Sequence, residues 1–181
     1  MRSEPPSSQP KQLMLGITEA GVMHTDADPP FDLDTRFRMV KEAGVYDYYD
    51  KTPESRAQVP EYLAASEKYD LPILAGGWYY RLGQDEDLLR EKLSISAEVG
   101  SRVHNTQILW KHKQGHVVTN DEIEDIYLRA YEWGDAVGCL PTFEVHIHMW
   151  SEDFLRVSEV GERIERRGIP FRITLDHSHV I

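Results

Sequence analysis

Cysteine is almost absent from this sequence of 181 residues, which contains only Cys139. A single cysteine excludes an intramolecular disulfide framework and a zinc site built from cysteines alone. Long apolar runs are missing too, since no stretch approaches the roughly 20 residues that a membrane-spanning helix needs. The first ten residues contain no apolar core of the kind that a secretory signal requires. We therefore expect a cytoplasmic protein with no part inserted in a membrane.

Positive charge is also scarce. The chain has 20 Lys and Arg residues against 31 Asp and Glu residues, a formal net charge of −11. Nucleic acids and anionic membranes are bound through clustered Lys and Arg. The run Lys111-His112-Lys113 is too short to form such a cluster. The composition therefore argues against a nucleic-acid or membrane partner.

The sequence indicates one domain behind a polar start. Residues 1–11 are rich in Pro and Ser, and we expect them to form a mobile tail. Residues 12–181 are long enough for one hydrophobic core. Within them, short apolar runs alternate with longer helical patterns. The predicted strands are 13–17, 45–49, 72–75, 102–108, 142–148 and 171–176, and the predicted helices are 33–43, 56–69, 86–99, 120–137 and 153–167.

Several helix ends carry their own signals. Thr119 and Glu122 have the spacing of a capping box, which predicts that a helix begins at this point. Four glycines follow predicted helices where a left-handed residue belongs, a conformation that glycine adopts at little cost. They are Gly44, Gly100, Gly138 and Gly168.

Strict alternation of strands and helices predicts a parallel sheet, in either a doubly wound sheet or a barrel. The segment from Gly16 to Gly21 lacks the glycine spacing of a nucleotide-binding turn, which disfavours the doubly wound sheet. The last two strands alternate in polarity, whereas a sheet buried on both faces would be apolar throughout. Polar residues that point inward near the C-terminal rim are typical of an α/β barrel of the TIM (β/α)₈ type. The inward set is Glu144, His146 and His148 on one strand and Arg172, Thr174 and Asp176 on the next.

Glu144 and Asp176 are therefore expected to point into the barrel from adjacent strands. Two buried carboxylates are costly unless something pairs with them. A divalent cation would do so, with Mg²⁺ or Mn²⁺ favoured by carboxylates and Mn²⁺, Co²⁺ or Zn²⁺ by added imidazole. The alternative is a structural network in which Glu144 pairs with Arg172 and Asp176 caps a following helix.

These residues resemble the xylose-isomerase-like superfamily of (β/α)₈ barrels, a group of sugar isomerases, epimerases and related metal enzymes. The resemblance rests on Phe143-Glu144-Val145-His146 and on Leu175-Asp176-His177-Ser178-His179, within about residues 13–181. It implies that Glu144 and Asp176 are metal ligands and that His179 contacts the substrate.

The resemblance also implies a chemistry. The cation, Mn²⁺ or Mg²⁺ first and Co²⁺ or Zn²⁺ next, would act as a Lewis acid on a small carbohydrate and stabilise an enediolate. Glu144 would serve as ligand and base and move the proton beside the carbonyl. A related lyase or dehydratase would use the same intermediate.

A complete barrel needs about 250 residues, and we expect six βα strands in this chain, without the family's ligands from strands seven and eight. The barrel would then be incomplete, and a complementing chain segment or a homo-oligomer would cover its open edges. Two further hypotheses stay open: a non-catalytic subunit or binding module, and an abasic-site endonuclease. The endonuclease is disfavoured by the acidic charge and by the lack of a histidine in Leu74-Ala75-Gly76-Gly77-Trp78.

Other residues have both a functional and a structural interpretation. His146 is predicted to contact the substrate or to be a packed core histidine. Trp78, placed just after the third strand, is predicted to form a pocket wall or to cover the core. Asp47 and Asp50 close the second strand, where either could reach a substrate hydroxyl, although a solvated loop is the simpler interpretation. On the fourth strand, His104 and Gln107 are candidates for the pocket, and Cys139 is assigned to packing.

Overall fold

The computed structural model describes residues 13–23 and 29–176. The expected tail, residues 1–11, and His179 of the predicted site both lie outside these ranges. Among the described residues, no helix has both the length and the apolar character needed to cross a membrane.

The described residues form one sheet in which every strand is parallel to the next. Its order is β1-β2-β3-β4-β5-β6, so strands adjacent in sequence are adjacent in space. A doubly wound sheet would reverse its order partway, so this order is that of a barrel wall. The strands are Gly16–Thr18, Tyr48–Asp50, Ile73–Tyr80, Val103–Ile108, Leu140–Val145 and Ile173–Leu175.

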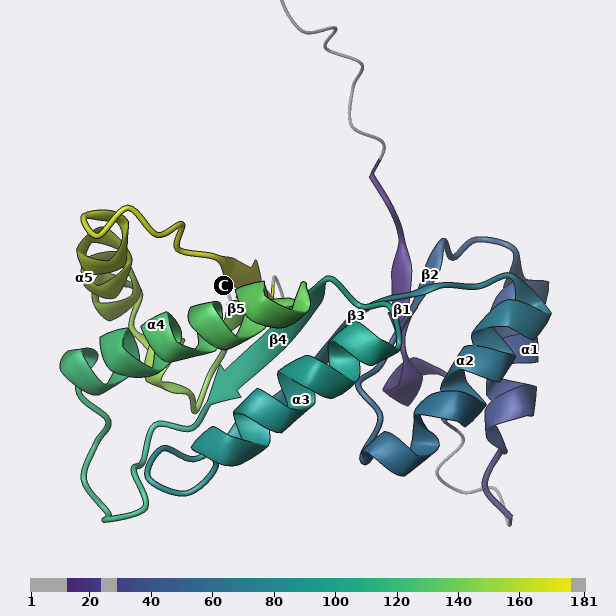
Figure 1. Cartoon of the computed structure of the whole chain (residues 1–181), viewed down its shortest axis with the longest axis horizontal. Coiled ribbons are helices and arrows are strands. Elements are labelled where there is room, and N and C mark those ends of the chain that lie inside the picture. The colour runs from purple at the N-terminus through teal and green to yellow at the C-terminus, as the bar shows by residue number, and fades with distance from the viewer. Residues whose placement is uncertain (1–12, 24–28, 177–181) are drawn as a thin grey trace, which may run out of the picture.

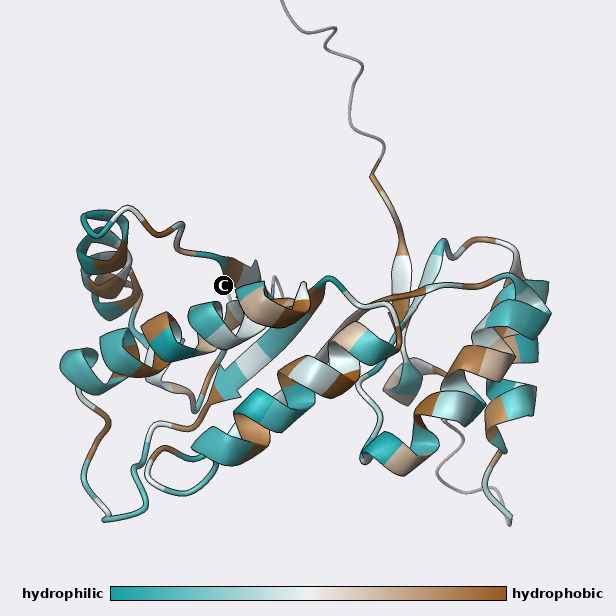
Figure 2. Ribbon diagram, viewed as in Figure 1, coloured by the Kyte–Doolittle hydropathy of each residue, from teal (hydrophilic) through white to brown (hydrophobic). Residues whose placement is uncertain are grey.

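The helices between the strands lie along one side of the sheet (Figure 1). They are α1 Leu33–Ala43, α2 Val59–Tyr69, α3 Glu86–Glu98, α4 Asn120–Val137 and α5 Phe154–Glu165. Figure 2 shows hydrophobic and hydrophilic bands alternating along them, as expected of helices that cover a sheet. Six parallel strands with helices on their outer side make a curled half-barrel, and the predicted fold class is confirmed.

Two apolar clusters join the helices to the sheet. The larger packs α3, α4 and α5 against β3, β4 and β5, with Tyr127, Phe143 and Trp150 among its buried side chains. The smaller packs α1 and α2 against the first strands around Phe37 and Tyr49, whose rings stack at 4.2 Å. Both clusters lie on the helical side, which leaves the other face of the sheet for polar residues.

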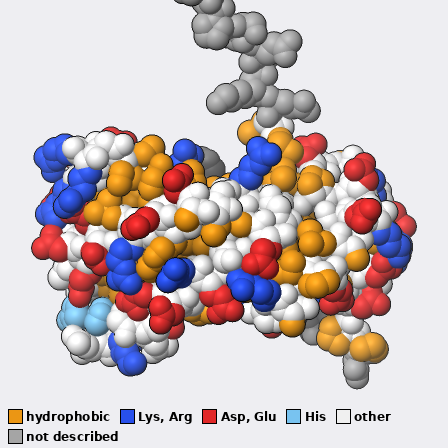
Figure 3. Space-filling view, viewed as in Figure 1, with side chains coloured by type: hydrophobic (Ala, Val, Ile, Leu, Met, Phe, Trp, Pro, Cys, Tyr) orange, Lys and Arg blue, Asp and Glu red, His pale blue; other side chains and the backbone are white. Residues whose placement is uncertain are grey.

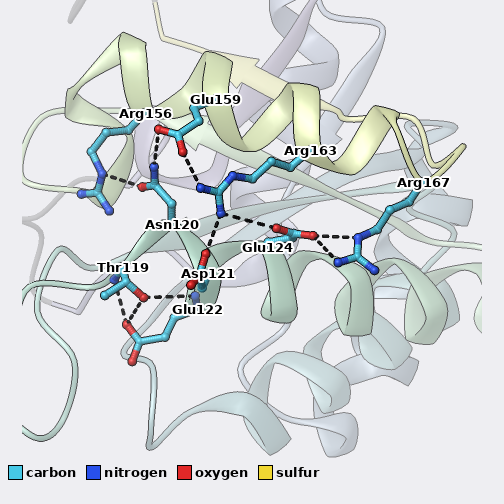
Figure 4. Close-up of polar contacts among 9 residues, drawn as sticks. All are labelled: Thr119, Asn120, Asp121, Glu122, Glu124, Arg156, Glu159, Arg163 and Arg167. Carbon is cyan, nitrogen blue, oxygen red and sulfur yellow. Dashed lines mark hydrogen bonds and ion pairs between the residues drawn. The ribbon is translucent and has the colours of Figure 1, made fainter.

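The predicted helix signals are confirmed. The Thr119 side chain accepts from the Glu122 N–H, and the Glu122 side chain accepts from the Thr119 N–H, so the capping box is complete. Gly44 and Gly138 follow α1 and α4 with φ of +67° and +81°. Figure 4 shows how α4 is also tied to α5, since the Arg163 guanidinium pairs with Asp121, Glu124 and Glu159.

All six strands have other limits than the sequence predicts, and the differences in the third and fifth strands bear on the site. The third strand continues through Gly76 and Gly77 to Tyr80, so Trp78 lies within β3 and not after it. Both glycines are needed because neighbouring segments approach closely: a Cβ on Gly76 would clash with Thr52, just after β2, and one on Gly77 would lie 2.9 Å from Asn105 Cβ on β4. The pair that marked an end in the sequence is instead a close contact inside the sheet.

The fifth strand ends earlier than predicted, at Val145. His146 and His148 therefore lie in the following turn, where His148 adopts a φ of +62°. On β6, Ile173 and Leu175 lie on the apolar side of the strand, yet they are 45% and 41% exposed. This strand lies at the edge of the described sheet.

Candidate active site

A cavity of about 350 Å³ lies on the face of the sheet opposite the clusters that join it to the helices. The strand ends of β1 to β4 and the residues just after them form its wall. The lining combines charged, amide and aromatic side chains, among them Glu19, Asp50, Lys51, Trp78, Asn105 and Gln107. Such a mixture suits a polar small molecule that also presents apolar surface.

Glu144 enters this polar face from β5. It is only 6% exposed, and its flanking residues Phe143 and Val145 are buried in the larger apolar cluster on the other side of the sheet. The Asn105 side-chain amide, from β4, donates a hydrogen bond of 2.6 Å to Glu144 Oε2. Within the part of the chain that the structure describes, Arg172 and Glu144 form no ion pair. The alternative of a Glu144–Arg172 pair is therefore wrong.

Asp176 and His146 lie beside Glu144. One potential ligand atom from each of the three side chains lies within 4.8 Å of the others. Asp176 follows β6, which pairs with β5 in a register that places Thr174 beside Glu144. Strand alternation then puts Thr174 and Asp176 on the same face as Glu144. The sequence predicted this convergence of the two acids, but it assigned His146 to the substrate and not to the acidic pair.

A hydrogen bond orients the His146 ring. Its Nδ1 lies 2.6 Å from the carbonyl oxygen of Ile147, and a carbonyl can only accept, so Nδ1 is the donor in this contact. A backbone carbonyl that orients the ring in this way is the usual support of a metal-binding histidine.

The donor set therefore fits a divalent cation. Two carboxylates and one imidazole nitrogen match Mn²⁺, with Mg²⁺, Co²⁺ and Zn²⁺ as further possibilities. Glu144 is buried with one oxygen committed to Asn105, and its burial near a second acid is costly without a positive partner.

Asp50, at the end of β2, is a site residue that sequence reasoning underrated. It was assigned to a solvated loop, but it is half-buried and lines the cavity. Burial, and in second place the charge of Glu144, raise the pKa of Asp50 to about 6. A carboxyl group with such a pKa can exchange a proton near neutral pH. The position of Asp50 at a strand end was the available signal.

No feature of the sequence marks Glu19 as a site residue. It is 6% exposed after β1, and its carboxylate forms ion pairs with Arg36 at 2.9 Å and Lys51 at 3.0 Å. It also accepts hydrogen bonds from the hydroxyls of Tyr49 and Tyr62. This network fixes Lys51 at the cavity wall and connects the wall to α1 and α2.

The remaining predicted positions divide between the two faces. Trp78 borders the cavity, but its ring also packs against the larger apolar cluster, and the ammonium of Lys92, from α3, lies 3.8 Å from the ring centroid. Gln107 also lines the cavity, whereas His104 is fully buried on the helical side. The Tyr80 hydroxyl lies 2.6 Å from His104 Nε2, and burial lowers the pKa of His104 to about 3. His104 is thus a neutral core residue, and its assignment to the pocket is wrong.

No protein-family model and no curated protein matches this sequence. Solved structures do resemble the chain. A D-allulose 3-epimerase from Methylomonas sp., in complex with D-allulose, matches with a TM-score of 0.73 at 16% identity, over 94% of this chain and 65% of that chain. A 3-keto-D-glucoside 4-epimerase from E. coli matches with a TM-score of 0.69 at 14% identity, over 93% of this chain and 70% of that one.

An AP endonuclease of family 2 from Brucella melitensis matches as well, with a TM-score of 0.66 at 11% identity, over 92% of this chain and 70% of that one. The chain thus spans about two thirds of the length of the structures that it resembles. These similarities confirm the fold that the sequence predicts: the chain has the fold of the xylose-isomerase-like TIM-type barrels, over six of their strands.

Proposed function

We propose that this chain is the main part of a divalent-metal-dependent isomerase or epimerase that acts on a sugar or a sugar derivative. The observation that carries the proposal is the convergence of Glu144, His146 and Asp176, whose ligand atoms lie within 4.8 Å of one another. This cluster lies on the same face as a polar cavity of about 350 Å³. Two of the structurally similar proteins are sugar epimerases, which supports a carbohydrate substrate.

Glu144, Asp176 and His146 would hold the cation, with Mn²⁺ or Mg²⁺ as the first candidates. When bound, the cation would act as a Lewis acid toward the carbonyl oxygen of a ketose. Glu144 would also move the proton on the carbon beside that carbonyl. His179 and Trp78 would contact the sugar, His179 as a hydrogen-bonding group and Trp78 as an apolar wall.

The direct test is proton exchange in D₂O. The full chain, loaded with Mn²⁺, is incubated with D-allulose or D-fructose, and the signal of the proton beside the carbonyl is followed by proton NMR. We expect the signal to disappear with the wild type and with His148→Ala. With Glu144→Gln we expect the signal to remain. Exchange that persists in Glu144→Gln would contradict the role of Glu144, and no exchange with any ketose would contradict the substrate class.

A second candidate is a non-catalytic subunit or binding module. It is favoured by the exposed apolar side chains of Ile173 and Leu175 on the edge strand β6. A complementing chain segment or a second copy of this chain would cover them. Light scattering of the purified chain separates the cases, since a dimer without metal binding would support the subunit and a metal-loaded chain with exchange activity would exclude it.

A third candidate comes from the similarity to an AP endonuclease. The net charge of −11 opposes binding to DNA. Cleavage of a duplex that contains one abasic site, at physiological salt and lost in Glu144→Gln, would favour the endonuclease over the isomerase.

A further inference from the structure

A second cluster of potential metal ligands lies where the loop between β4 and α4 meets the first turn of α4. It consists of His112, His116 and Glu122, and one potential ligand atom from each lies within 4.8 Å of the others. The cluster shares no residue with the candidate active site. Figure 3 shows histidine side chains at the lower left of the surface, over this loop, beside acidic side chains.

The backbone holds the two histidines opposite each other. The His112 N–H donates to the His116 carbonyl at 3.0 Å, and Gly115, with a φ of +92°, allows the tight turn between them. A bridge between Lys111 and Val117 continues this small hairpin. As a result the two imidazole rings stack, with centroids 4.5 Å apart.

The third member belongs to a fixed helix end. Glu122 lies in the first turn of α4, where its Oε2 accepts from Thr119 in the capping box. Its other oxygen, Oε1, faces His116 Nε2 at 2.8 Å. The His112 ring lies against Gly83, where a Cβ would come within 2.4 Å of it. The three groups are therefore brought together by a hairpin, a helix cap and a glycine contact before any ligand is present.

The surroundings are accessible and acidic. A cavity of about 370 Å³ beside His112 and Glu122 is lined by further carboxylates and by a single cation, and its charged lining is Glu86, Asp121, Asp125 and Arg129. Arg129 is itself paired with Asp125. The nearby Lys111 ammonium lies over the Trp110 ring, 4.5 Å from its centroid. A cation that approaches the histidines thus meets mostly negative charge.

We propose that His112, His116 and Glu122 form a second cation site, of the zinc type, which fastens the β4–α4 hairpin to the start of α4. Two imidazoles and one carboxylate are the ligands that Zn²⁺ prefers, with an open position for water. In a tetrahedral zinc site the ligand atoms are about 3.3 Å apart, so small side-chain rotations would bring the three atoms to that spacing. The exposed Gln114 N–H donates to His112 Nδ1 at 3.1 Å. When the ion binds, this N–H can donate to a water molecule instead.

The test measures Zn²⁺ binding to the full chain by calorimetry. The background is the Glu144→Gln, Asp176→Asn double variant, which removes the other cluster. We expect this background to bind one Zn²⁺ per chain, and His112→Ala or His116→Ala to weaken that binding at least tenfold. His148→Ala, which removes an exposed histidine outside both clusters, should leave it unchanged. Replacement of Zn²⁺ by Co²⁺ should give the strong visible absorption of a low-coordinate site, and Mg²⁺ should not bind there.

Circular dichroism verifies that each variant is folded, and His116→Gln provides a second, more conservative change. No Zn²⁺ binding in the double variant would overturn the proposal and leave the cluster as a hydrogen-bonded loop closure. Unchanged binding after His112→Ala and His116→Ala would also overturn it. Because both clusters are tested separately, failure of this site has no bearing on the proposed catalytic function.

Discussion

The side-chain amide of Asn105 donates a 2.6 Å hydrogen bond to Oε2 of Glu144, and thereby joins β4 to β5 on the cavity face of the sheet. The Asn105 Oδ1 is buried and, among the described residues, has no hydrogen-bond partner. The contact therefore orients both side chains. In a metal site such an outer hydrogen bond fixes the ligating carboxylate and tunes its affinity.

Replacement of Asn105 by Leu should weaken Mn²⁺ binding by about 10- to 100-fold, because the Glu144 carboxylate loses the bond that orients it. Calorimetric titration with Mn²⁺ measures the effect. Gln107→Leu is the matched control, since Gln107 is the next residue that lines the cavity from the same strand. Equal affinities of the two variants would show that the Asn105 bond has no influence on the cation.

Replacement of Asp50 by Asn should stabilise the protein at pH 7, by about 3 kcal/mol. The pKa of Asp50 is raised from its ordinary value of 3.8 to about 6 in the folded protein. At a pH between these two pKa values, the folded state binds more protons than the unfolded state. This contribution to stability is therefore present at low pH and is lost as the pH rises through about 6.

Urea unfolding at a series of pH values tests this prediction. The wild type should lose stability between pH 4 and pH 6 relative to Asp50→Asn, and the two curves should run parallel above that range. Asp135→Asn, at an exposed position, should follow the wild type throughout. A difference in stability between the wild type and Asp50→Asn that does not change with pH would mean that folding does not raise the pKa of Asp50.

Replacement of Glu19 by Gln should destabilise the fold by about 3 kcal/mol, because it leaves the charges of Arg36 and Lys51 without their common partner. Tyr62→Phe removes only one neutral donor to the same carboxylate and should cost about 1 kcal/mol. The urea midpoints of the two variants give the comparison. A loss in Glu19→Gln no larger than that in Tyr62→Phe would show that the ion pairs add little to stability.

The helices were predictable because their ends are encoded locally. Residues 33–43 and 120–137 form helices with the predicted limits, since Gly44 and Gly138 stop them and the Thr119 box starts the second. The limits of a strand depend on the neighbouring segments of the sheet, and the predicted limits of the strands were less accurate. The strand signal of Gly76-Gly77 cannot be distinguished from a turn without Thr52 and Asn105, which lie against these glycines from the segment after β2 and from β4.

The site was predictable only in part, because only some of its features are encoded in local sequence patterns. The alternation of polar and apolar residues was enough to bring Glu144 and Asp176 to one face. It could not show that the strand ends at Val145, where the buried Ser151 hydroxyl donates to the Glu144 carbonyl. Nor could it reveal Glu19 or Asn105, because their partners are up to 43 residues distant in the sequence.

The central claim is that Glu144 and Asp176 hold one cation between them, and Mn²⁺ binding to the purified chain tests it most directly. Electron paramagnetic resonance counts free and bound Mn²⁺ in the wild type, Glu144→Gln, Asp176→Asn and the exposed control Asp135→Asn. We predict that each site variant lowers the affinity at least tenfold and that the control matches the wild type. Wild-type affinity in both Glu144→Gln and Asp176→Asn would contradict the claim.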